Sequence, residues 1–525
     1  MNSGPIQPEL AEPYLLSVLS SAGLDIEYSR AEGNTLYSVD EDGREFSVLD
    51  LAGGYGSLLL GHNNPEITAY ATSLLEARTP VLTQFSRHSP ANELAAELNR
   101  IIHRELGTDE AYYAIFANTG AEAVEAAVKH AEMDRVMRLG AIGEEIAAHI
   151  EQARAAVSGG SAVVAAGVDG SVGTGSAGRT DIADVADFDE LVAALTRANA
   201  EQFSRPPVLL APEGSFHGKL VGSVQLTHNE GYRAPFRALA AQARFVPLDQ
   251  PETLRKTVDE ERGILLDLVV ENGVVRTVER PAPVFCAFVL EPIQGEGGIR
   301  EVSRAYAEEI QRICAEIDCP VIVDEIQSGM GRTGSFLAGS QIGLRGDYYV
   351  LAKSMGGGLA KTSVMLVREA RYRREFEMVH SSTFAKDGFS TLIALKVLEL
   401  LEADGGRLYR RAAEVGGRLL AALESVRADF PDVVNDVRGR GLIAGLEFRD
   451  QGDAASEALR EPARAGLFGY VLAGWLLQDH RIRTFPTASA VNTLRFEPSV
   501  QLTDADIDHV EGALREVCTR IRRQA

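Results

Sequence analysis

The sequence of 525 residues has few cysteines, no excess of positive charge and no long hydrophobic run. Its four cysteines, Cys286, Cys314, Cys319 and Cys518, contain no CxxC pair, which argues against a disulfide framework and a structural zinc site. We therefore expect no metal. The formal net charge of -23 argues against a general nucleic-acid binder, because the protein would repel a phosphate backbone.

The amino-terminal residues have neither the basic start nor the unbroken apolar stretch of a signal peptide. No later segment reaches the roughly 18 consecutive apolar residues that a membrane-spanning helix needs. With 45% apolar and 24% charged residues, the composition is typical of a soluble globular enzyme. We expect a cytoplasmic protein that makes no contact with a membrane.

Short strand-like runs alternate with helical periodicity along most of the chain. AYYAIFAN is followed by AEAVEAAVKHAEMDRVMRL, and FCAFVLEP is followed by RAYAEEIQRICAEI. Because strand and helix alternate, the sequence predicts an α/β fold with a mostly parallel sheet covered by helices. In such sheets, ligands bind at the carboxyl ends of the strands.

Two stretches interrupt this alternation. We expect a helix to end near Leu139, and the Gly-, Ser- and Ala-rich residues that follow predict a loop-rich insertion over about 140–207. A second addition, over about 251–284, contains the hairpin signal Asn272-Gly273 between valine-rich runs. Both additions are either tolerated surface segments or elements that shape a pocket beside the site.

Two charged residues stand at the ends of apolar strands. Asp324 ends the run PVIVD, and Lys353 follows DYYVLA and opens a glycine-rich turn. A carboxylate in that position keeps a pyridine nitrogen protonated, and partial desolvation of a lysine amine favours imine chemistry. Taken alone, Asp324 is equally well explained as a cap of the following turn, and Lys353 as a solvated surface charge.

The run IFANTGAEAVEAAVKHA predicts a strand, a tight turn and a helix. Gly120 and Ala121 stand at the start of this helix, where free backbone N–H groups bind phosphate. An ordinary capped helix is the alternative interpretation of this motif.

Six blocks of sequence occur in the order found in class III aminotransferases of the ornithine and 4-aminobutyrate type: TGAEA, FHG, EPIQGEGG, VDEIQSGMGRTG, AKSMGGG and HSSTF. The similarity covers roughly residues 45–130, 208–235 and 285–500. The chain thus resembles a family that depends on pyridoxal 5'-phosphate (PLP).

The resemblance implies fold type I of the PLP-dependent transferases, in which a large domain holds a mostly parallel sheet covered by helices. A smaller α/β domain is then formed by the amino- and carboxyl-terminal segments. On this basis we expect residues 76–387 to form the large domain and residues 1–75 and 388–525 to form the small one.

The resemblance also implies the roles of individual residues at the cofactor. Lys353 resembles the lysine that carries PLP as a Schiff base, and Asp324 resembles the partner of the pyridinium nitrogen. The other implied contacts are Gly120 and Ala121 at the phosphate, Phe216 stacked on the ring, Gln327 near the ring hydroxyl, Glu291 close to the cofactor, and Thr383 reaching the phosphate from the other subunit. The family therefore implies a homodimer with shared sites.

Four further residues resemble the family's substrate contacts. Arg495 resembles the arginine whose guanidinium fork binds the donor's α-carboxylate, and Glu296 the glutamate that pairs with it when the substrate lacks that carboxylate. Tyr55 resembles a pocket tyrosine. Lys219 stands where members that bind a distal carboxylate commonly have arginine, which argues against 4-aminobutyrate or acetylornithine but still suits the γ-carboxylate of glutamate.

These residues together imply an aminotransferase with a ping-pong mechanism. We expect L-glutamate as donor, pyridoxamine 5'-phosphate as the intermediate form of the cofactor, and an aldehyde or ketone acceptor, in specialised biosynthesis if the additions shape the pocket. A 2-aminomutase, racemase or decarboxylase of the same fold uses the same lysine and aspartate. A non-catalytic PLP-binding protein is a further alternative.

Overall fold

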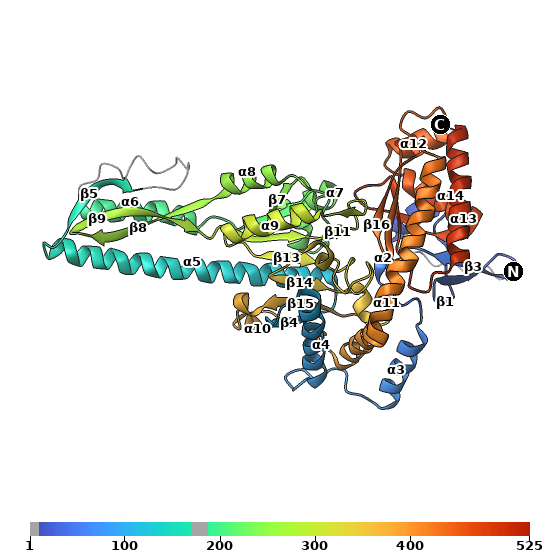
Figure 1. The fold of residues 1–525 in the computed structure, drawn as a ribbon, viewed down its shortest axis with the longest axis horizontal. Coiled ribbons are helices and arrows are strands. Elements are labelled where there is room, and N and C mark those ends of the chain that lie inside the picture. The colour runs from blue at the N-terminus through green and yellow to red at the C-terminus, as the bar shows by residue number, and fades with distance from the viewer. Residues whose placement is uncertain (1–9, 170–186, 525) are drawn as a thin grey trace.

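A seven-stranded sheet forms the centre of the protein in a computed structural model that describes residues 10–169 and 187–524 (Figure 1). Its order is β4-β15-β14-β13-β10-β6-β7. Only β15 is antiparallel to its neighbours, so the predicted mostly parallel sheet is confirmed. The strands are β4 (Tyr112–Ala117), β6 (Val208–Pro212), β7 (Ala243–Val246), β10 (Phe285–Leu290), β13 (Val321–Asp324), β14 (Tyr348–Leu351) and β15 (Ser363–Arg368).

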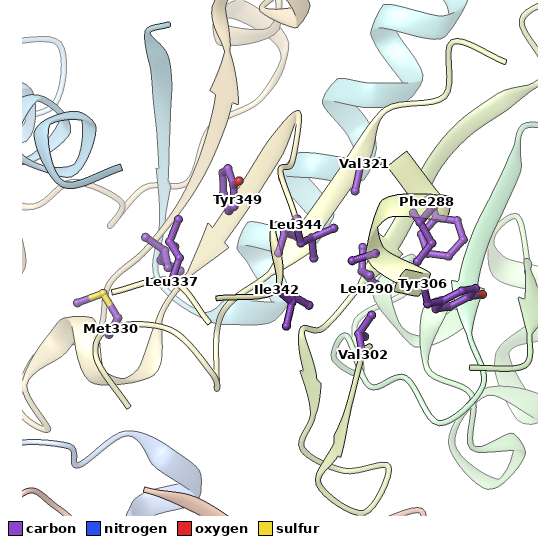
Figure 2. Close-up of a cluster of buried hydrophobic side chains, with 14 of the residues drawn as sticks. Phe288, Leu290, Val302, Tyr306, Val321, Met330, Leu337, Ile342, Leu344 and Tyr349 are labelled. Atoms are coloured by element: carbon purple, nitrogen blue, oxygen red, sulfur yellow. The ribbon is translucent and has the colours of Figure 1, made fainter. Parts of the chain in front are cut away.

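Alternate residues of the central strands pack against opposite helical layers, as the pleat of a strand requires. In β13, Ile322 packs against the alanine-rich face of α5, whereas Val321 and Val323 pack on the opposite side with Tyr306 of α9. Figure 2 shows part of this second layer. Burial on both faces explains why the strands are continuous apolar runs. The helices around the sheet are α4 (Ser89–Leu106), α5 (Gly120–Ser158), α8 (Pro251–Glu261) and α9 (Arg304–Glu316).

The predicted end of a helix near Leu139 is wrong, because α5 continues to Ser158. Gly140 and Gly143 are typical of a helix end, but each glycine costs a helix only about 1 kcal/mol. The surrounding Ala- and Glu-rich sequence is a strong helix former and outweighs that cost. The extension buries Leu139, Ile146 and Ala153, seven residues apart and therefore on one face.

The rest of the supposed loop-rich insertion also contains regular structure, in β5 (Val163–Asp169) and α6 (Phe188–Phe203). Its residues 170–186 lie outside the described part of the chain. The second addition contains α8 and the antiparallel pair β8 (Gly263–Glu271) and β9 (Val274–Ala282), joined at Asn272-Gly273. In the three-stranded sheet β5-β9-β8, segments distant in sequence are therefore joined.

The carboxyl half of α5 together with β5, α6, β8 and β9 forms a projection that we call the arm. Figure 1 shows the arm extending to the left of the central sheet, while the carboxyl-terminal elements lie at the right. Asn199 of α6 closes the edge of β8 by bonding both the N–H and the carbonyl of Leu266, each at 2.8 Å. The continuous helix α5 runs from beside the central sheet into the arm.

The carboxyl-terminal region contains an antiparallel sheet of order β16-β17-β20-β19. Its strands are β16 (Val434–Arg440), β17 (Ile443–Phe448), β19 (Phe485–Pro486) and β20 (Thr493–Phe496), and its helices are α11 (Gly388–Asp429), α12 (Glu457–Arg464), α13 (Phe468–His480) and α14 (Asp504–Gln524). The backbone of α11 leaves helical geometry between Ala403 and Gly406, which divides it into two helical segments.

Near the amino terminus, the described chain forms a small sheet that includes a strand from the other end of the sequence. Its order is β1-β2-β3-β18, and β3 pairs in parallel with β18. These elements are α1 (Pro13–Ser21), β1 (Arg30–Glu32), β2 (Thr35–Val39), β3 (Glu45–Asp50), β18 (Ile482–Arg483), α2 (Gly53–Gly56) and α3 (Pro65–Glu76). The division into 1–75, 76–387 and 388–525 stays a prediction. Within the described residues, no helix combines the length and apolarity required to cross a bilayer.

We predict that Gly416→Ala destabilises the protein and that Gly417→Ala does not. A methyl group at Gly416 would lie 2.0 Å from the carbonyl oxygen of Gly441, whereas one at the exposed Gly417 would meet nothing within 4 Å. Overpacking should cost about 1–3 kcal/mol, and a helical Gly-to-Ala change in open space should gain up to about 1 kcal/mol. Calorimetry should therefore give a lower Tm for Gly416→Ala; equal Tm values would contradict this close approach.

Candidate active site

A cavity of about 420 Å³ lies at the carboxyl ends of the central strands. The residues around it come from the turns that follow β4, β6, β10, β13 and β14, as expected for a ligand site in a parallel sheet. It is lined by Gly120, Ala121, Phe216, Glu291, Glu296, Asp324, Gln327 and Lys353, among others. No described residue of the arm lines it. The additions therefore do not shape this cavity within the described part of the chain.

Lys353 begins the short helix η4 (Lys353–Gly356) directly beyond β14. Its backbone has φ +48°, a left-handed conformation that a residue with a side chain adopts only where its surroundings hold it. Burial lowers the pKa of its ammonium group, although the carboxylates of Glu497 and Glu296 oppose this shift. A larger share of the amine is therefore neutral, the form that attacks a carbonyl or accepts a proton.

Asp324 ends β13 with only 4% of its surface exposed. His217 Nδ1 donates to its Oδ2 at 2.8 Å, and the Ile326 N–H donates to its Oδ1 at 3.1 Å. Burial alone would lower the pKa of His217, but the hydrogen bond and charge of Asp324 raise it. No local sequence pattern identifies this partner of Asp324, because a single histidine beside Phe216 is more often structural than catalytic. The His217 contact fixes the carboxylate and leaves it facing the cavity.

The amino terminus of α5 carries a complete capping box. Thr119 Oγ1 accepts from the Glu122 N–H at 3.3 Å, and Glu122 Oε2 accepts from the Thr119 N–H at 3.0 Å. These contacts leave the N–H groups of Gly120 and Ala121 without a protein partner among the described residues, and both residues line the cavity. A side chain at Gly120 would place its Cβ 2.8 Å from Ile326 Cδ1, so glycine is needed for this packing. The arrangement suits an anion such as phosphate.

Arg495 of β20 and Glu296 form a buried bidentate ion pair. Arg495 is 1% exposed, and its Nη1 and Nη2 donate to Glu296 Oε1 and Oε2 at 2.6 and 2.5 Å. Burial alone would raise the pKa of Glu296, but the charge of Arg495 lowers it. Arg495 also lies 5.1 Å from the ring of Tyr55, which stacks on Phe485 at 6.1 Å. Glu296 therefore occupies both terminal nitrogens of the Arg495 guanidinium.

Glu291 holds the backbone of Phe216, which follows β6 and lines the cavity. Its Oε2 accepts from the Phe216 N–H at 2.9 Å, and its Oε1 accepts from the Gly295 N–H at 3.2 Å. Burial raises the pKa of Glu291 to about 7. The carboxyl group thereby ties Phe216, which lines the cavity, to the loop after β10.

Lys219 lies at the exposed side of this region and does not line the cavity. Its Nζ lies 3.8 Å from the ring centroid of Tyr232 and 6.0 Å from that of Phe216. No ion pair of Lys219 occurs within the described residues, so its ammonium rests on an aromatic face. A cation on a ring is held loosely enough, by about 0.5–1 kcal/mol at an exposed site, to pair with an anionic ligand instead.

Thr383 is exposed and does not line the cavity of its own chain. Its carbonyl accepts from Gln84 Nε2 at 3.0 Å, while the preceding Ser382 Oγ accepts from Asn118 Nδ2 at 2.7 Å. The single chain therefore does not bring Thr383 together with Gly120 and Ala121, and its role across a dimer stays a prediction.

Glu497, which contacts Gln327, is a site residue that was not predicted from the sequence. Gln327 lines the cavity, and its Nε2 donates to Oε1 of the fully buried Glu497 at 2.6 Å. The signal was present in LRFEPSV, where Glu497 follows Arg495 by two positions, the spacing that puts side chains on one side of an extended chain. Tyr232 was missed as well, because nothing in its sequence context distinguishes it from a surface tyrosine.

Comparisons with known proteins agree with the family and fold that the motifs predict. The model of the family described as Aminotransferase class-III matches residues 19–510. The chain is 27% identical to aminotransferase PigE of Serratia sp., over 98% of this chain and 53% of PigE, so it spans about half of that relative. It is 28% identical to a diaminobutyrate–2-oxoglutarate aminotransferase of Rhizobium meliloti, over 93% of this chain and 87% of the relative.

A solved structure shows the same fold. The omega transaminase of Pseudomonas jessenii in complex with PMP gives a TM-score of 0.68 at 19% identity, with 99% of this chain and 96% of that chain covered. The predicted fold class is therefore confirmed.

We predict that Glu296→Gln lowers the free energy of unfolding by about 3–5 kcal/mol, because it removes the carboxylate that is paired directly with the buried Arg495. Glu309→Gln is the matched control, since Glu309 makes a similar two-contact pair with Arg312 at the surface, where solvent screens both charges. Chemical denaturation of the two variants should show a large loss only for Glu296→Gln. Similar losses would mean that burial does not set the strength of the Arg495 pair.

Proposed function

The chain belongs to the class-III aminotransferase family, and from that membership and the cavity's geometry we propose that it transfers an amino group from L-glutamate to an aldehyde or ketone. We propose PLP as its cofactor and a ping-pong order of the two half-reactions. The observation that carries the proposal is the convergence of Lys353 and Asp324 on one cavity, Asp324 as the last residue of β13 and Lys353 two positions after the end of β14.

The residues around the cavity fit PLP. The free N–H groups of Gly120 and Ala121 suit its phosphate, the buried carboxylate of Asp324 suits its ring nitrogen, and the amine of Lys353 suits its carbonyl carbon. Phe216 offers an aromatic face for the ring. When bound, PLP supplies an electron-withdrawing ring that makes the α-proton of an attached amine removable.

The chain's own residues hold charge and move the proton. Asp324, fixed by His217, holds the proton of a ring nitrogen in place through the reaction. The lowered pKa of Lys353 makes its amine a base at neutral pH. Its Nζ accepts the α-proton of the donor and then delivers that proton to the cofactor's carbonyl carbon. His217 positions Asp324 and does not itself reach a substrate in this proposal.

The buried ion pair supports glutamate as donor. Arg495 can bind the α-carboxylate in two parallel hydrogen bonds once Glu296 moves aside, and Glu296 restores the pair when an acceptor without that carboxylate is bound. Lys219 supplies a second positive charge for the γ-carboxylate. One pocket thereby serves two unlike substrates.

Tyrosines near this pair support a bulkier carbonyl acceptor of a specialised biosynthetic pathway. Tyr55 and Tyr232 carry large aromatic rings. Burial raises the pKa of Tyr232, and the charges of Glu296 and Arg495 are both near enough to affect it, in opposite directions. We also propose a homodimer, in which the exposed Thr383 reaches the partner's cavity, and a cytoplasmic location, which the four unpaired buried thiols support.

We predict that the PLP-loaded protein has a visible absorption band that glutamate bleaches, with 2-oxoglutarate formed in equal amount. The Lys353→Ala variant, which lacks the base, should bind PLP without this response. A band that glutamate leaves unchanged would contradict the donor, and carbon dioxide or an isomerised amino acid as product would favour a decarboxylase, aminomutase or racemase. If wild-type protein develops no band with PLP, the cofactor proposal fails.

We predict that Lys219→Met lowers kcat/KM for glutamate by about 10- to 100-fold, because a charge-assisted hydrogen bond contributes about 1.5–3 kcal/mol. The half-reaction with alanine, which has no distal carboxylate, should change little. Single-turnover bleaching rates over a range of donor concentrations measure both values. An equal loss with both donors would exclude Lys219 as the γ-carboxylate contact.

A further inference from the structure

The amide of Gln327 is enclosed on two sides by residues that leave it one orientation. On one side, its Nε2 donates to Glu497 Oε1 at 2.6 Å. On the other side it packs on the backbone of Gly295, where a Cβ would lie 1.7 Å from Gln327 Oε1 and 2.5 Å from Cδ. Only a residue without a side chain leaves room for the amide in this position.

The charge of Glu497 determines which end of the amide faces it. A carboxylate can only accept, so it selects the Gln327 nitrogen over the oxygen. Glu497 is fully buried, and its negative charge is balanced by that of Arg332, which is equally buried and, among the described residues, donates to the carbonyls of Gly56, Leu442 and Pro498. Burial lowers the pKa of Arg332 to about 10, and the charge of Glu497 opposes that shift.

One donor of the amide remains for the cavity. A primary amide nitrogen carries two N–H groups, and Glu497 uses one of them. Gln327 lines the cavity together with Asp324 and Lys353. If Glu497 were absent, rotation of the amide by a half-turn would exchange this donor for an acceptor.

We propose that Glu497 and Gly295 are positioning residues that hold the Gln327 amide with an N–H directed at the ring oxygen of the bound cofactor. This inference rests on the proposed function, since it assumes that PLP occupies the cavity. Neither residue touches the cofactor in this arrangement; both act through Gln327.

The proposal has a spectroscopic consequence. An N–H donor stabilises the ionised form of the ring oxygen, so losing it makes the bound cofactor retain its proton to higher pH. Hydrogen bonds to charged groups contribute enough to move such a titration by about one pH unit or more. The pH midpoint of the visible band reports this change without any turnover.

The test compares PLP-loaded wild type with Gly295→Ala, Glu497→Leu and Glu497→Gln. In Gly295→Ala, the three atoms nearest the added methyl all belong to the Gln327 amide and none to the backbone, so we expect the fold to be kept while the amide is displaced. We expect upward midpoint shifts of about one pH unit or more for Gly295→Ala and Glu497→Leu, and a smaller one for Glu497→Gln, which keeps an acceptor. Gly297→Ala is the matched control, because its methyl would meet Gly214 and Gln294 but not Gln327.

A double variant separates action through Gln327 from a general disturbance. Gln327→Ala should show the full shift, and adding Gly295→Ala to it should shift the midpoint no further. Additive shifts, or a wild-type midpoint in Gly295→Ala, would overturn the proposal even if Glu497→Leu failed to fold. A wild-type protein that forms no visible band would instead overturn the proposed function, so the two failures are distinguishable.

Discussion

The burial of charge at the carboxyl end of the central sheet is the constraint on which the rest of the site depends. Asp324, Glu296, Glu497, Arg332 and Arg495 are withdrawn from water there, and an isolated buried charge is strongly destabilising. Each therefore needs a specified partner. Asp324 has His217, Arg495 has Glu296, and Glu497 has the Gln327 amide together with the charge of Arg332.

This requirement links parts of the chain that are far apart in sequence. Glu296 follows β10 of the central sheet, whereas Arg495 lies on β20 of the carboxyl-terminal sheet. Arg332 binds carbonyls from residues 56, 442 and 498 at once, so its guanidinium joins the amino-terminal segment to the carboxyl-terminal region. The same contacts that satisfy buried charges thus fix the relative position of the segments around the cavity.

How far the sequence predicts this molecule depends on whether the information is local. The central strands could be predicted because both of their faces are apolar, which makes each a continuous apolar run. Lys353 and Asp324 could be predicted because each stands at the end of such a run within a specific motif. The end of α5 was not readable, since Gly140 and Gly143 resemble a helix terminus until packing of Ile146 and Ala153 outweighs their cost. Glu497 was missed for a related reason: its spacing from Arg495 is local, but its partner Gln327 lies 170 positions away, and that pairing is what brings Glu497 to the cavity.

The arm, which contains most of the two inserted segments, contributes no described residue to the lining of the cavity. Its sheet and α6 pack on the carboxyl half of α5, while the amino terminus of the same helix lines the cavity (Figure 1). A partner bound to the arm can act on the cavity by shifting α5 as a whole, or through the short links that join α6 to β6 and β9 to β10. The capping box at Thr119 and Glu122 and the close packing of Gly120 on Ile326 oppose such a shift. Among the described residues, those that line the cavity, Glu296 among them, all lie outside the arm.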